Sequence, residues 1–137
     1  MLHKDVKIEL IKAVPLFAGC SKKELRQIAM MADEIDFKPG KDLIKEGTPG
    51  REFFVLIRGS ADVRRGGRTV DSLGPGEFFG EMALLTDVPR SATVTTTSVV
   101  DTLVITATNF KRLVTVYPLI GLKVMRAVAE RIPPDAV

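Results

Sequence analysis

Apolar residues in the first third of the chain recur at helical spacing and predict two helices. Within residues 5–14, one helical face carries Val6, Leu10, Ile11 and Val14, and Pro15 ends the pattern. A second helix is expected to begin at Ser21. There "SKKE" has the spacing of a capping box, in which Ser21 and Glu24 each accept a hydrogen bond from the other's backbone amide. The buried stripe of this helix is expected to be Leu25, Ile28, Ala29 and Ala32.

From residue 34 the pattern changes to short strands separated by turns. Turn-forming sequences recur about every ten residues: "KPG", "GTPG", "RGS", "RGG" and "GPG". Between them lie runs rich in apolar and β-branched residues, such as "EFFVLI" and "ATVTTTSVV". Gly66 and Gly67 lie between "ADVRR" and "RTVDSL" and suit a two-residue hairpin turn that requires positive φ twice. This rhythm predicts an antiparallel β-roll of the jelly-roll type.

Helical spacing returns at the end of the chain. Thr108 is expected to cap a helix that contains "NFKRLVTVY", and Pro118 suits the first turn of a last helix that runs to about Ile132. The sequence therefore predicts a single α+β domain. Its parts are N-terminal helices in 1–33, the roll in 34–107 with a short helix inside it, and two C-terminal helices in 108–137.

Composition and charge argue against several classes of function. A chain of 137 residues is long enough for one globular domain. Its net charge is only +3, and Arg64, Arg65 and Arg68 are expected to form a solvated hairpin tip, which argues against nucleic-acid binding. The single cysteine, Cys20, excludes an internal disulfide, and the single histidine, His3, argues against histidine-based catalysis or metal binding. Neither a membrane span nor a signal peptide is visible, so a cytoplasmic location without membrane insertion is expected.

One stretch, "GPGEFFGEMALLTDVPRSATV" at 74–94, interrupts the strand rhythm. Its apolar residues fit one short helical turn after Gly80, and the amides at a helix start attract anions. Arg90 adds a planar guanidinium that suits phosphate oxygens. Glu81 would repel a phosphate, unless it accepts hydrogen bonds from another part of the same ligand, such as a ribose hydroxyl beside a cyclic phosphate. The alternative is that Glu81 and Arg90 form an ion pair with each other.

The segment "FFGEMALLTDVPRSAT" resembles the phosphate-binding cassette of the cyclic nucleotide-binding domains. The resemblance covers nearly the whole chain, including "VPLF" and "GTPGREFFVLIRGS", and points particularly to the cAMP-binding domains of bacterial cyclic-nucleotide-regulated channels. It implies a regulatory sensor without catalysis that binds cAMP or cGMP, with a modest preference for cAMP. The signal would pass through the last helix to an effector domain or partner protein. No cofactor, metal or nucleic acid is expected.

The resemblance also implies a role for each position of the cassette, residues 79–92. Phe79 begins the motif, Glu81 would accept the ribose 2′-hydroxyl, and Arg90 would hold an exocyclic phosphate oxygen. The other implied ligand contacts are Gly80, Met82 and Ala83 along the phosphate and ribose, Ser91 and Ala92 as amide donors, and Val63 and Leu73 beside the purine.

Arg131 in the last predicted helix has two interpretations. With Val124 and Val128 it forms a stripe at positions i, i+4 and i+7. If the valines face the roll, Arg131 would lie over its mouth and stack on the base as a lid, as the resemblance to channel domains implies. Otherwise the arginine interacts with the dipole at the helix C-terminus.

Two other functions compete with a cyclic nucleotide sensor of this kind. A cupin-type enzyme would need several metal-binding histidines, and the sequence contains one histidine. A sensor domain of the catabolite-activator type that lacks its DNA-binding part is the alternative. DNA binding by the chain itself is not expected, because two prolines, and not a helix-turn-helix, follow the last helix.

Overall fold

Three helical segments precede the strands in this computed structural model, which describes residues 4–131. They are α1 (Lys4–Lys12), the 3₁₀ helix η1 (Pro15–Phe17) and α2 (Lys22–Met31). The predicted capping box is present, because Glu24 N donates to Ser21 Oγ at 3.1 Å and Ser21 N donates to Glu24 Oε1 at 2.8 Å. The predicted stripe is buried as well, at Leu25, Ile28, Ala29 and Ala32.

The first helix is shorter than its apolar spacing predicted. It ends at Lys12 and does not continue to Pro15. The residue before a proline is driven to extended conformations, and Val14 has φ −77° and ψ 125°. Val14 is nevertheless buried, whereas Val6 is 45% exposed and Ile8 packs against the core in its place.

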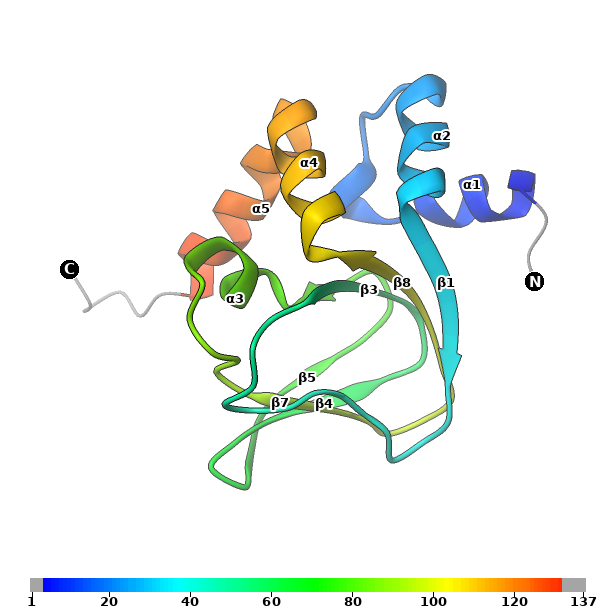
Figure 1. The fold of residues 1–137 in the computed structure, drawn as a ribbon. Coiled ribbons are helices and arrows are strands. Elements are labelled where there is room, and N and C mark those ends of the chain that lie inside the picture. The colour runs from blue at the N-terminus through cyan, green and yellow to red at the C-terminus, as the bar shows by residue number, and fades with distance from the viewer. Residues whose placement is uncertain (1–3, 132–137) are drawn as a thin grey trace.

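Within the described residues, eight strands form two antiparallel four-stranded sheets, which confirms the predicted β-roll (Figure 1). One sheet has the order β1-β8-β3-β6 and the other the order β2-β7-β4-β5. The roll begins at Ala32, slightly before the predicted start at 34, because Ala32 already pairs with Ile105. The strands are β1 (Ala32–Phe37), β2 (Asp42–Ile44), β3 (Glu52–Arg58), β4 (Ala61–Arg65), β5 (Arg68–Leu73), β6 (Phe78–Phe79), β7 (Thr93–Thr96) and β8 (Val100–Thr106).

The hairpin between β4 and β5 has the predicted two-residue turn. Gly66 has φ 60° and Gly67 has φ 78°, and the strands pair directly beside them, at Arg65 and Arg68. Residues with a Cβ rarely adopt two consecutive positive φ angles, so glycine at both positions keeps the turn tight.

The core lies on both faces of the sheet that contains β3. Phe53 and Val55 face the helices, where the ring of Phe53 lies 4.6 Å from that of Phe110. Phe54 and Leu56 face the interior of the roll. Because both faces are covered, β3 is an uninterrupted apolar run and does not alternate with polar residues.

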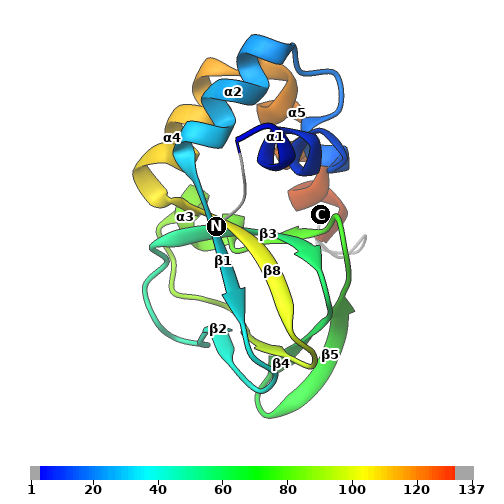
Figure 2. The ribbon, with the colours of Figure 1, turned by 90° about the vertical axis from the view of Figure 1, so that its right-hand side faces the viewer.

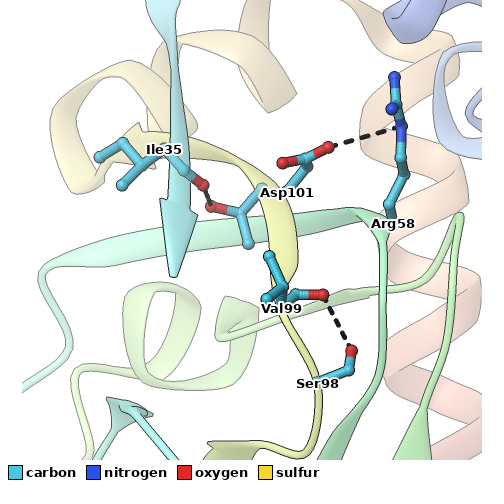
Figure 3. Close-up of polar contacts among 6 residues, drawn as sticks. Ile35, Arg58, Ser98, Val99 and Asp101 are labelled. Atoms are coloured by element: carbon cyan, nitrogen blue, oxygen red, sulfur yellow. Dashed lines mark hydrogen bonds and ion pairs between the residues drawn. The ribbon is translucent and has the colours of Figure 1, made fainter. Parts of the chain in front are cut away.

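Polar contacts connect β8 with its neighbouring strands (Figure 3). Thr102 Oγ1 donates to Ile35 O at 2.8 Å, and Arg58 Nε lies 3.5 Å from Asp101 Oδ2. Asp101 lies opposite Asp36 in the β1–β8 register. A hydrogen bond between their side chains raises the pKa of Asp101. Like charges opposite each other destabilise a strand pair. The positive charge of Arg58 beside Asp101 offsets part of the repulsion between Asp36 and Asp101.

The helices α4 (Ala107–Val116) and α5 (Pro118–Arg131) follow the roll and pack beside the N-terminal helices (Figures 1 and 2). Thr106, and not Thr108, caps α4, because Thr106 Oγ1 accepts from Asn109 N at 3.2 Å. Thr106 ends β8 and has the extended backbone of an N-cap residue, whereas Thr108 is already inside the helix. None of the helices in the described part has the length and apolar character to cross a bilayer.

Candidate ligand-binding site

The predicted cassette forms a short helix between the roll and the C-terminal helices. The helix α3 (Glu81–Thr86) follows β6 and contacts β3, α4 and α5 (Figure 1). Gly80 is its N-cap residue and has φ 93°. The expected helical turn after Gly80 is therefore present at the expected place.

Arg90 is a buried cation held by two backbone carbonyl groups. Its Nη1 donates to Gly80 O at 2.7 Å, its Nη2 donates to Glu52 O at 2.6 Å, and the residue is 5% exposed. Burial lowers the pKa of Arg90, and the nearby Glu52 offsets part of this effect. Arginine is not deprotonated in proteins, so a full positive charge lies here. These bonds use one N–H group on each of the two terminal nitrogens of the guanidinium.

Gly80 is required by this arrangement for two reasons. Its φ of 93° lies in the region that residues with a Cβ avoid. A Cβ atom at this position would also lie 2.9 Å from Arg90 Nη1 and 3.1 Å from Glu52 O. The guanidinium thus occupies space that only glycine leaves open.

Glu81 is the second buried charged residue of the cassette. It is the first residue of α3 and is 0% exposed. A buried carboxylate is costly unless polar groups compensate for its lost hydration, so its burial here indicates a polar role and not a packing role.

A cavity of about 500 Å³ extends from these two residues along the inside of the roll. Ten of the eleven residues predicted to contact a ligand line it: Val63, Leu73, Phe79, Gly80, Glu81, Met82, Ala83, Arg90, Ser91 and Ala92. The eleventh is Arg131, whose side chain lies outside the described part of the chain. Phe79 also stacks on Phe54, with ring centroids 5.1 Å apart, so it belongs to the core and to the cavity wall.

Six further residues of the described chain line the cavity although the sequence did not mark them as ligand contacts. They are Ile44, Arg65, Val70, Asp71, Val94 and Glu130. Arg65 is exposed at the hairpin tip, as the sequence predicted, and its Nε in addition donates to Ser91 O at 3.0 Å. Strand alternation was a usable signal, since it places Arg65 on the same face as Val63. Glu130 had no comparable signal, because its position depends on where α5 docks.

The carboxylates of Glu34, Asp36 and Asp101 form an acidic cluster elsewhere, with ligand atoms within 4.8 Å of one another. These three residues lie on β1 and β8, and none of them lines the cavity. The cavity itself is lined by two arginines, by carboxylates, backbone groups and apolar walls. This set suits an organic anion that also carries hydroxyl groups.

Comparison with known proteins identifies the family. The profile of the cyclic nucleotide-binding domain matches residues 34–117. The chain belongs to the cyclic nucleotide-binding domain family. Over 106 residues it is 35% identical to a cAMP-dependent protein kinase regulatory subunit of Eremothecium gossypii, covering 77% of this chain and 23% of that protein.

Solved structures of this domain family share its fold. The structure of cAMP-bound PfPKA-R (141-441) has a TM-score of 0.84 and 26% identity, covering 93% of this chain and 44% of that one. The catabolite activator protein of Thermus thermophilus has a TM-score of 0.77 and 29% identity, covering 85% and 57%.

The family resemblance and the fold predicted for this cyclic nucleotide-binding domain are thereby confirmed. The sequence pointed in particular to bacterial channel domains, whereas the relative described above is a kinase regulatory subunit. The chain spans about a quarter of the length of the curated relatives it matches.

Proposed function

We propose that this domain is a regulatory sensor that binds cAMP. The observation that carries the proposal is a cavity shared by the buried Arg90 and the buried Glu81. The guanidinium suits a cyclic phosphate, and the carboxylate suits the ribose 2′-hydroxyl. Val63 and Leu73 in the same cavity supply apolar surface for a purine. The regulatory-subunit relative and PfPKA-R, both named for cAMP, agree with this ligand.

Calorimetric titration with cAMP, cGMP and 5′-AMP tests the proposal. cAMP is expected to bind most tightly, with cGMP weaker by roughly tenfold, about 1.4 kcal/mol. The linear monophosphate should bind more weakly still. It lacks the cyclic constraint and carries about −1.5 to −2 charge at pH 7, which increases repulsion with Glu81. Equal affinities for cAMP and 5′-AMP would contradict a cyclic phosphate at Arg90.

We propose further that α5 relays ligand binding to an attached effector domain or a partner protein. Glu130, in the last turn of α5, lines the cavity. Lys123 Nζ, nearer the start of α5, donates to Pro15 O at 3.0 Å and to Ala18 O at 2.5 Å. The helix therefore connects the ligand cavity with the N-terminal segment η1. A ligand that favours one docking position of α5 would change the contacts of α5 with the cavity and with η1 together.

The outer face of α5 is the candidate surface for this output. Leu122 is 46% exposed and Met125 is 67% exposed, whereas Val124 on the opposite side is buried. Leu122 and Met125 thus give α5 a second, exposed apolar face beside the one that is buried. The role of Arg131 as a lid over the base stays a prediction, to be tested by the effect of Arg131→Ala on the rate of nucleotide release.

Amide hydrogen exchange with and without saturating cAMP tests the relay. We expect added protection over 79–92 from ligand contact and a change over 118–131 from redocking of α5. Residues 22–31 of α2 serve as an internal reference, since none of them lines the cavity. Protection confined to 79–92 would show that cAMP binds but that α5 does not transmit the signal.

A further inference from the structure

The β4–β5 hairpin places one arginine against the ligand cavity and its neighbour away from it. Val63 and Arg65 both line the cavity, whereas Arg64, between them, does not. This follows from the alternation of side chains along a strand. Arg64 and Arg65 therefore carry the same charge at adjacent positions but on opposite faces of β4.

The tip of this hairpin is joined to the end of the cassette by hydrogen bonds. Arg65 Nε donates to Ser91 O at 3.0 Å. Gly66 N donates to Glu46 Oε1 at 3.0 Å, and Glu46 N donates to Thr93 Oγ1 at 2.9 Å. The hairpin tip, the loop after β2 and the start of β7 thus hold one another in place.

The same loop also holds the backbone of Arg90. Gly47 N donates to Arg90 O, and Arg90 N donates to Thr48 O, both at 2.8 Å. Arg65 donates a side-chain hydrogen bond to Ser91 O. The loop after β2 therefore holds the backbone of Arg90, and Arg65 holds the carbonyl group of the next residue, Ser91.

The bond to Ser91 O determines the direction of a ligand donor. Ser91 O and the amide N–H of Ala92 belong to one planar trans peptide unit, so they point in opposite directions. When Arg65 draws the carbonyl toward the hairpin, the N–H of Ala92 must point away from the Arg65 Nε atom. A charged donor on the carbonyl also polarises the peptide and makes its N–H a stronger donor.

We infer that Arg65 is a positioning residue for the phosphate cassette, acting through its Nε–H bond to Ser91 O. This inference rests on the proposed function and names a residue that sets the affinity of the same site. Arg65 orients the Ser91–Ala92 peptide, and the oriented N–H of Ala92 then serves the cyclic phosphate beside Arg90. The essential property of Arg65 is the donor at the Nε position, and its net charge is secondary.

Three substitutions separate the donor from the charge. Glutamine carries its amide nitrogen at the same number of bonds from Cα as arginine Nε, so Arg65→Gln keeps a donor there without the charge. Lysine keeps the charge but has a methylene at that position, so Arg65→Lys loses the donor. Arg65→Met removes both. Arg64→Met is the matched control, because it removes the same charge from the adjacent position on the outer face.

Titration of these variants with cAMP gives the first test. We expect Arg65→Met and Arg65→Lys to bind roughly three- to tenfold more weakly than the parent, the range for loss of one hydrogen bond. Arg65→Gln should retain most of the affinity, and Arg64→Met should bind like the parent. Parental affinity of Arg65→Met, or full affinity of Arg65→Lys with loss in Arg65→Gln, would overturn the inference.

Amide exchange in the nucleotide-free protein gives a second test that does not depend on the ligand. Exchange at residues 91–93 should be faster in Arg65→Met than in Arg64→Met, while urea unfolding of the two variants stays equal. If the parent bound no cyclic nucleotide, the proposed function would fail, and this exchange difference would still decide whether Arg65 orders the cassette. Equal exchange in the two variants would show that it does not.

Discussion

Replacement of Arg90 by Leu is expected to weaken cAMP binding by about 2–4 kcal/mol, because it would remove the charge-assisted contact proposed between Arg90 and the cyclic phosphate. This corresponds to a loss of affinity of roughly 30- to 700-fold. Arg90→Lys should fall between the parent and Arg90→Leu, since a lysine keeps the charge but not the fork that reaches Gly80 O and Glu52 O. Calorimetric titration of the three proteins measures the effect.

The unfolding of Arg90→Leu must be measured beside its binding. The substitution leaves Gly80 O and Glu52 O without the donors that now reach them, so urea unfolding should show a loss of about 1–3 kcal/mol. Arg68→Leu is the control for charge alone, because Arg68 is an exposed residue that does not line the cavity. If folded Arg90→Leu bound cAMP as the parent does, the phosphate would not lie at Arg90.

Replacement of Gly80 by Ala is expected to reduce both stability and cAMP affinity. The φ of 93° should cost an alanine about 1–2 kcal/mol. The new Cβ would in addition lie 2.9 Å from Arg90 Nη1, so the guanidinium must move from its present position. Urea unfolding measures the first effect, and titration with cAMP measures the second.

Gly40→Ala separates backbone strain from the contact with Arg90. Gly40 has φ 81°, and a Cβ there would meet nothing within 4 Å. We expect Gly40→Ala to lose a similar amount of stability while keeping the parental affinity for cAMP. Equal affinities of Gly40→Ala and Gly80→Ala would show that Gly80 serves only the chain's turn and not the position of Arg90.

Local signals in the sequence were sufficient where the interaction itself is local. Ser21 and Glu24 each accept a hydrogen bond from the other's backbone amide within one helical turn. Gly66 and Gly67 supply the two positive φ angles of their turn from adjacent positions. Local signals were misleading where a neighbouring element took precedence. Thr106, as the last residue of β8, became the cap of α4 that Thr108 was expected to form.

The sequence by itself determined the family, the order of the elements and the position of the cassette. Its strongest signals depend on residue types at short fixed spacing: a glycine with positive φ, an acid directly after it, and an arginine in the following loop. Strand alternation places Arg65 on the face of Val63, but only the tertiary structure decided that Arg65 reaches Ser91 O and that Glu130 lines the cavity of Arg90. Arg65 reaches Ser91 O because the loop after β2 holds the hairpin tip, and Glu130 lines the cavity because α5 docks on η1 and α4. The docking of α5 and of the hairpin tip depends on many contacts between residues that are far apart in the sequence. A motif of short, fixed spacing cannot predict those contacts.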